Sequence, residues 1–319
     1  METFVSLFPE SYKKSIAEAY RSGQWTELFL RVGQPAIFYL NGREHVLLEN
    51  GNLFCLETDI LDVLKSCHLV TKQELQAILQ QATQATPMVY REEIGQGYLT
   101  LEGGHRLGFA GHIVEEENQK GLNYFKHING MMLRIAKERK GCAQKVLPFL
   151  VHENRLLNTL VISPPACGKT TLLRDCARML SNGFDDFFGK KTVIIDERME
   201  LAAVWNGMSQ FDVGRRTNVM SGCKKETAFV MAVRSLSPEI LIADEIGFQE
   251  ECRGLLYGIY SGCSVLCSTH GSDVDEVRER NGLQSLFHEG IFKRYVILHK
   301  QEHHYGAKVF DEKGQLLNG

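Results

Sequence analysis

A glycine, a lysine and a threonine stand together in a segment that is suited to hold phosphate groups. The segment follows an apolar run, 157–162, and precedes a helical pattern that begins at Thr171. Its residues are Ser163, Pro164, Pro165, Ala166, Cys167, Gly168, Lys169 and Thr170. In such a loop the backbone N–H groups surround the phosphates, Lys169 contacts the β- and γ-phosphates, and the hydroxyl of Thr170 binds Mg²⁺. We therefore expect residues 163–171 to bind ATP together with Mg²⁺.

The loop departs from the common pattern G-x-x-x-x-G-K-[ST] at one position. Ser163 stands where the first glycine is expected. Glycine adopts backbone angles that other residues adopt only at a cost, so we expect Ser163 to weaken nucleotide binding. Pro164 and Pro165 partly offset this loss because they stiffen the loop. For this segment alone, the alternative is a helix N-terminus that contains Gly-Lys-Thr by chance.

A second pattern, an apolar run that ends in two carboxylates, favours nucleotide hydrolysis. Residues 239–247 read Glu-Ile-Leu-Ile-Ala-Asp-Glu-Ile-Gly, which predicts a strand that is buried on both faces of a parallel sheet. Ligands bind at the carboxyl ends of such strands, where Asp244 and Glu245 fall. We expect Asp244 to hold Mg²⁺ through water and Glu245 to polarise the attacking water. A turn or a helix cap is the alternative for this pair alone.

Polar residues follow two further apolar runs, and parallel strands would bring all of them to one edge. The run 191–196 ends in an acidic cluster, and the segment 264–271 ends in Ser-Thr-His-Gly. The side chains expected beside Lys169 are Asp196, Glu197, Glu200 and His270. We expect a catalytic role for Glu200, and we expect His270 to hydrogen-bond the γ-phosphate region rather than act as a general base. A solvated acidic turn and a structural histidine are the alternatives.

An arginine from a neighbouring subunit often completes a phosphate-loop site, because it neutralises charge that develops during phosphoryl transfer. Arg215 and Arg216 follow Gly214 in a predicted loop and are candidates for this role in trans. The further candidates are Arg198, Arg234, Arg31 and Arg134.

The apolar runs that precede these polar residues alternate with helical patterns between residues 141 and 319. This alternation predicts an α/β domain in which helices flank a parallel sheet. A helix is predicted over 146–153, where the chain enters this domain. The last segments, 295–298 and 307–317, are expected to be strands.

Residues 1–140 are predicted to form a smaller α+β domain without a nucleotide motif. We expect this domain to pack against a neighbouring subunit or a partner. The alternative is that it is a folding appendage without such a role. The local signals are a helix over 8–21, a hairpin turn at Asn41-Gly42, a capping box from Thr71 to Glu74, and a hairpin of 98–101 with 106–114.

The order of the motifs resembles that of the RecA-like secretion ATPases of type II and type IV systems. In detail the chain is more similar to the stage III sporulation protein AA family of spore-forming bacteria. The supporting segments are 97–111, 195–200, 212–217 and 234–238, and the resemblance runs from about residue 30 to residue 270. It implies a RecA-like P-loop ATPase that forms a homohexamer, lies in the cytoplasm and docks on membrane channel proteins of a sporulation or secretion-like complex.

The charge of the chain does not favour a nucleic-acid-binding function, but it does not exclude one. The 319 residues carry a net charge of −3, and basic pairs such as Lys224-Lys225 are expected on the solvated surface. No long basic run is present, so we expect no stable nucleic-acid partner. RecA-like cores also drive nucleic-acid motors, so a nucleotide-dependent nucleic-acid ATPase is the alternative. A scaffold that binds nucleotide without turnover is the third candidate.

Membrane insertion and disulfide bonding are not expected. No apolar stretch approaches the roughly 18 residues that a transmembrane helix needs, and no signal-peptide pattern begins the chain. The nine cysteines are scattered and lack zinc-like spacing, which fits a reducing cytosol.

Overall fold

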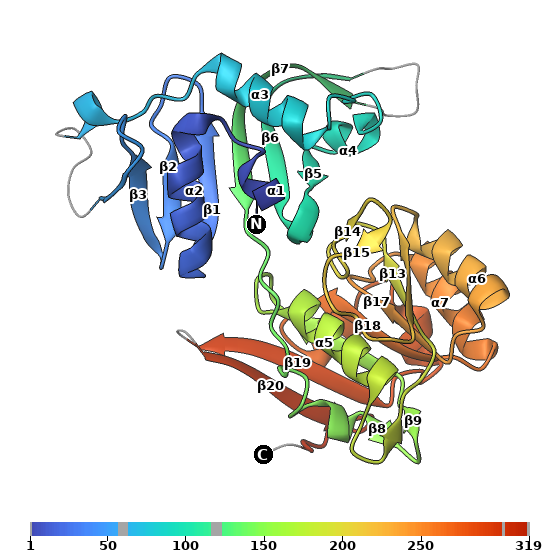
Figure 1. The fold of residues 1–319 in the computed structure, drawn as a ribbon. Helices are drawn as coiled ribbons and strands as arrows, with labels where there is room; N and C mark the ends of the chain where they lie inside the picture. Colours follow the sequence, from blue (N-terminus) through green and yellow to red (C-terminus); the bar gives the residue numbers. More distant parts are fainter. Residues whose placement is uncertain (1, 57–62, 116–122, 302–303, 318–319) are drawn as a thin grey trace. The chain divides into compact units, whose positions relative to one another are not determined.

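The structure of the chain is a computed structural model that describes residues 2–56, 63–115, 123–301 and 304–317. The chain divides into two compact units, Met1–Lys137 and Glu138–Gly319 (Figure 1). Each unit has its own sheet and its own buried core.

Among its described residues, the N-terminal unit contains an antiparallel sheet with the strand order β4-β3-β2-β1-β7-β6-β5. Leu28 and Leu30 of β1 share a core with Ile16 of α2 and Ile78 of α3, so these helices cover one face of the sheet. The strands are β1 (Trp25–Arg31), β2 (Ile37–Leu40), β3 (Arg43–Leu47), β4 (Leu53–Cys55), β5 (Tyr98–Thr100), β6 (Arg106–Glu115) and β7 (Asn123–Arg134). The helices are α1 (Glu2–Val5), α2 (Glu10–Ser22), α3 (Lys72–Ala82) and α4 (Arg91–Gly95).

Two local predictions for this unit are confirmed. Asn41 and Gly42 have φ angles of 57° and 74° and join β2 to β3, as a two-residue hairpin turn requires. Thr71 Oγ1 accepts a hydrogen bond from the Glu74 N–H at 3.2 Å, and Glu74 Oε2 accepts one from the Thr71 N–H at 2.8 Å. This reciprocal pair is the capping box that begins α3.

The C-terminal unit contains a sheet with the strand order β16-β13-β17-β18-β10-β19-β20. All neighbours from β16 to β19 are parallel, and β20 is antiparallel to β19. The strands are β10 (Thr159–Ser163), β13 (Thr192–Asp196), β16 (Thr217–Ser221), β17 (Ile240–Ala243), β18 (Ser264–His270), β19 (Arg294–Gln301) and β20 (His304–Asp311). The helices are α5 (Lys169–Asn182), α6 (Lys225–Leu236), α7 (Gln249–Tyr260), α8 (Val274–Arg278) and α9 (Gln284–His288). In the described part of the chain, no helix is long and apolar enough to cross a bilayer.

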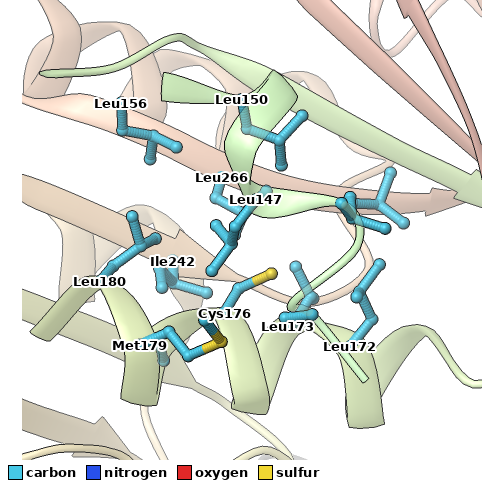
Figure 2. Close-up of a cluster of buried hydrophobic side chains, with 14 of the residues drawn as sticks. Leu147, Leu150, Leu156, Leu172, Leu173, Cys176, Met179, Leu180, Ile242 and Leu266 are labelled. Carbon is cyan, nitrogen blue, oxygen red and sulfur yellow. The ribbon is translucent and has the colours of Figure 1, made fainter. Parts of the chain in front are cut away.

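Alternate residues of the central strands enter two different cores, one on each face of this sheet. Ile242 of β17 lies in the core that includes α5, whereas the adjacent Leu241 lies in the core that includes α6 and α7. Figure 2 shows the first core, in which α5 packs over Ile242 and Leu266. The labelled α5 side chains are Leu172, Leu173, Cys176, Met179 and Leu180. The predicted burial of β17 on both faces is therefore confirmed, and it explains why this strand has no polar residue before its end.

The helix predicted over 146–153 is wrong. A short 3-10 helix, Leu147–Phe149, is followed by β8 (Val151–His152), which pairs with β9 (Arg155–Leu156). Pro148 has no N–H to continue a helix, and the two residues between β8 and β9 take left-handed φ angles of 46° and 58°. The apolar spacing that suggested a helix instead places Leu147 and Leu150 in the core (Figure 2).

Candidate nucleotide-binding site

The phosphate loop joins the end of β10 to the start of α5. The left-handed positions in the loop are Ala166 and Gly168, with φ angles of 59° and 89°. Ser163 is not among the residues with positive φ; it is the last residue of β10 and is completely buried. Its Oγ donates a hydrogen bond to the carbonyl oxygen of Pro164 at 2.9 Å. The backbone strain expected from a serine at the first-glycine position is therefore absent, and the requirement for glycine falls on Gly168.

Lys169, the first residue of α5, is 8% exposed and lies against His270 at the end of β18. Lys169 Nζ is 2.6 Å from His270 Nδ1. An ammonium group can only donate, so Nδ1 accepts and Nε2 carries the ring proton, which faces Glu245 Oε1. Burial lowers the pKa of Lys169, and the carboxylates of Asp244 and Glu245 oppose that change. The structure thus joins three predicted site residues in one hydrogen-bonded chain.

Thr170 and Asp244 form the part of the site that is suited to a cation. Thr170 Oγ1 donates to Asp244 Oδ2 at 2.8 Å. Mg²⁺ prefers oxygen ligands, so these oxygens fit its chemistry. No cluster of three or more His, Cys, Asp or Glu side chains suited to a metal occurs within the described ranges. An ion at this place would therefore need phosphate oxygens and water as its other ligands.

Ser268 of β18 connects the two carboxylate residues, and sequence reasoning did not assign it a role. Its Oγ contacts Asp244 Oδ1 and also accepts the backbone N–H of Glu245 at 3.0 Å. Glu245 itself has a left-handed φ of 55°, an uncommon conformation for a residue with a side chain. A serine at the end of the apolar run of β18 was the available signal, because a buried hydroxyl needs a hydrogen-bond partner.

Arg198 holds the second oxygen of the Glu245 carboxylate. Its Nη1 lies 3.0 Å from Glu245 Oε2 in the same chain. Glu245 is thereby placed between a guanidinium group and the His270 ring, which fixes the direction of its carboxylate. Arg198 was a candidate for action in trans, and here it contacts the site of its own chain.

The acidic cluster at the end of β13 lies beside the two carboxylate residues of the site. Asp196 accepts hydrogen bonds from three successive backbone N–H groups, those of residues 200–202, at 2.8 to 3.0 Å. Burial raises the pKa of the Asp196 carboxyl, and these N–H groups oppose the rise. Asp196 therefore caps the segment 200–202. Asp196, Glu197 and Glu200 all line a small cavity together with Asp244 and Glu245, so Glu200 stays a candidate.

Lys225 is a buried residue of this region that sequence reasoning placed on the surface. Its Nζ lies 3.0 Å from Glu197 Oε2 and 2.9 Å from Glu251 Oε1. Glu251 Oε2 in turn accepts the N–H groups of residues 247 and 248, just after Glu245. Burial lowers the pKa of Lys225, but its two carboxylate partners outweigh burial, and the pKa is raised. Lys225 therefore links the acidic cluster to the turn that carries Glu245.

Arg215 and Arg216 lie at the opposite end of α5 from the phosphate loop. The Arg215 N–H donates to Asn182 Oδ1 at 2.9 Å, and Arg216 Nη1 donates to the Ser181 carbonyl at 2.9 Å. A helix of this length places them about 20 Å from Lys169. Within one chain they do not reach the site, so a role for them requires a second subunit.

The sequence of the chain is similar to known proteins over almost its whole length. The family model for sporulation stage III, protein AA matches residues 10–317. The chain belongs to the stage III sporulation protein AA family. The stage III sporulation protein AA of Bacillus subtilis (strain 168) is 33% identical over 325 residues, which cover 100% of this chain and 97% of that protein. The expected family is therefore confirmed.

Solved structures show the fold of this stage III sporulation protein AA family member. The X-ray structure of the ATPase DotB from Legionella pneumophila aligns with a TM-score of 0.58 at 13% identity, covering 93% of this chain and 80% of that chain. The crystal structure of the pilus retraction motor PilT with bound ADP aligns with a TM-score of 0.56 at 14% identity, covering 96% and 82%. The predicted RecA-like α/β fold is confirmed by these two likenesses.

Proposed function

We propose that the chain hydrolyses ATP to ADP and phosphate at the carboxyl edge of the C-terminal sheet. The observation that carries this proposal is the chain of contacts from Lys169 through His270 to Glu245. It joins a cation at a phosphate loop to a carboxylate that can polarise water, which is the pairing that phosphoryl transfer to water requires.

Each residue has a distinct part in the proposed reaction. Lys169 binds the β- and γ-phosphates, and a phosphate oxygen takes the place of His270 Nδ1 as its acceptor. Bound Mg²⁺ would neutralise phosphate charge, and Thr170 and Asp244 are the residues that would hold it. Glu245 orients the attacking water, and His270 Nε2 holds the carboxylate in position. The loop residues 163–171 and Glu200 complete the proposed binding and catalytic set.

The biological role is proposed from the family and the fold. The full-length likeness to a stage III sporulation protein and the shared fold with a pilus retraction motor support a motor role in sporulation. The motor would be a homohexamer in the cytoplasm, peripheral to a membrane and docked on channel proteins. Residues 1–140 would form the oligomerisation or docking domain, and Arg215 or Arg216 would complete the site of the adjacent subunit.

ATP hydrolysis by the purified chain over a series of protein concentrations tests this proposal. Activity should rise more steeply than protein concentration, as expected for sites completed between subunits. Lys169→Ala and Glu245→Gln should both abolish it, whereas Lys145→Ala, which removes an exposed lysine, should not. Equal turnover in the wild-type and Glu245→Gln proteins would refute the proposed role of Glu245. Salt-sensitive stimulation by single-stranded DNA or RNA would instead favour the nucleic-acid alternative.

A further inference from the structure

The last strand of the sheet brings an exposed aromatic side chain to the phosphate loop. Tyr305 lies in β20, where it pairs in register with Lys300 of β19. A Cβ atom placed on Gly168 would lie 3.9 Å from Tyr305 Cδ1, so the ring borders the loop beside the start of α5. The side chain is 52% exposed, and Tyr305 is not a member of the buried core. Packing therefore does not account for an aromatic residue at this position.

The order of the strands gives a direction to any nucleotide in the loop. Lys169 contacts His270, the last residue of β18, and Thr170 contacts Asp244, which follows β17; both strands lie on one side of β10. The terminal phosphate and its ion therefore belong on that side. A triphosphate is a linear chain, so its nucleoside end must leave the loop on the other side. That side is occupied by β19 and β20, which carry Tyr305.

We propose that Tyr305 stacks on the base of the nucleotide bound in the phosphate loop. This inference rests on the proposed nucleotide site and names the residue that recognises the nucleoside. Lys300 Nζ lies 5.5 Å from the centre of the Tyr305 ring, which places a positive charge next to the nucleoside position. Every base presents a π-face, so the contact supports binding of nucleoside triphosphates without selecting adenine over guanine.

Binding of ATP and of inorganic tripolyphosphate, each with Mg²⁺, separates recognition of the base from recognition of the phosphates. We expect Tyr305→Ala to weaken ATP binding roughly 5- to 150-fold in calorimetric titrations, the range that stacking on one aromatic side chain gives. Tripolyphosphate binding should not change, because it has no base. Tyr305→Phe should keep wild-type affinity for both compounds. Tyr260→Ala, which removes another exposed tyrosine, is the matched control.

Each other outcome overturns the inference in an identifiable way. If Tyr305→Ala weakens ATP and tripolyphosphate equally, the residue supports the loop and does not contact the base. If it changes neither, the base lies elsewhere. If the wild-type protein binds neither compound, the proposed nucleotide site itself fails, and the stacking role fails with it.

Discussion

Lys169 Nζ lies 2.6 Å from Nδ1 of His270, a residue 101 positions later in the chain. This contact closes the site between adjacent parallel strands, because Ser163 of β10 and His270 of β18 are paired in register. The lysine is therefore already oriented by the sheet, and the same histidine ring reaches the Glu245 carboxylate. Geometry of this kind makes His270 a positioning residue for both ends of the proposed reaction.

His270→Gln should lower turnover and leave ATP affinity nearly intact. The variant loses the imidazole Nε2 contact that holds the Glu245 carboxylate in position, whereas the phosphate loop keeps its backbone donors. We expect a fall in kcat of about tenfold or more, with the ATP dissociation constant within about threefold of wild type. Steady-state kinetics and equilibrium titration measure the two quantities, with the exposed His288→Gln as control. A loss confined to ATP affinity would contradict this role.

Ser163→Gly should leave ATP affinity almost unchanged. The φ angle of Ser163 lies outside the left-handed region, so glycine relieves no strain there. We expect the dissociation constant to stay within about threefold of wild type, and we expect Gly168→Ala, at a φ of 89°, to weaken binding much more. Calorimetric titration of both variants makes the comparison. A large gain in affinity for Ser163→Gly would show that the serine does impair the loop.

Lys225→Met should destabilise the C-terminal unit by about 3 kcal/mol, because it leaves the Glu251 carboxylate buried without its cation. Turnover should fall as well, since Glu251 fixes the turn after Glu245. Chemical denaturation and ATPase assays measure the two effects. Lys225→Arg should recover part of each, and Lys224→Met, at the exposed neighbour, should have little effect on either. Equal stability of the Lys225→Met and Lys224→Met proteins would contradict the bridge.

The N-terminal unit should lose stability in mild acid because of His105. This residue is 2% exposed, and burial lowers its pKa from 6.5 to about 4. Its Nδ1 accepts the Ala136 N–H at 3.0 Å, a bond that protonation at Nδ1 would break. Between pH 6.5 and about 4, His105 is protonated in the unfolded chain but neutral in the folded one, so protonation favours unfolding. The contribution of His105 to stability is therefore complete above pH 6.5 and decreases as the pH drops toward 4.

The loss attributable to His105 should approach ~3 kcal/mol at the acid end of that window. Urea denaturation at a series of pH values measures it, with His105→Gln as the comparison. The variant should show a smaller dependence on pH than the wild-type protein. The same slope in both proteins would assign the acid sensitivity to other groups.

The sequence predicted each strand of the site from a local pattern, an apolar run with polar residues at its end. The apolar runs predicted the strands, and the order of polar residues at their ends predicted that Lys169, Asp244 and His270 would meet. The parallel sheet explains this success, because the ends of its strands share one edge whatever the details of packing. The hairpin at Asn41-Gly42 and the capping box at Thr71 were predictable for the same local reason.

The remaining features depend on contacts between segments that are distant in sequence. Asp196 was expected on the edge of the sheet that carries Lys169, but the hydrogen bonds by which its carboxylate caps residues 200–202 were not predicted. Lys225 was expected on the solvated surface, because its two partners, Glu197 and Glu251, are distant in sequence and could not be predicted. Tyr305 had no local signal at all, because its relation to the phosphate loop is created by the antiparallel addition of β20 to the sheet.

The hydroxyl of Ser268 contacts both Asp244 and the backbone N–H of Glu245, so it couples the positions of these two residues. If Asp244 moves to meet an ion, the hydroxyl must follow it, and the backbone that positions the water-polarising carboxylate then shifts as well. Binding of the cation and placement of the proposed water-polarising carboxylate would thus be coupled through a single hydroxyl group.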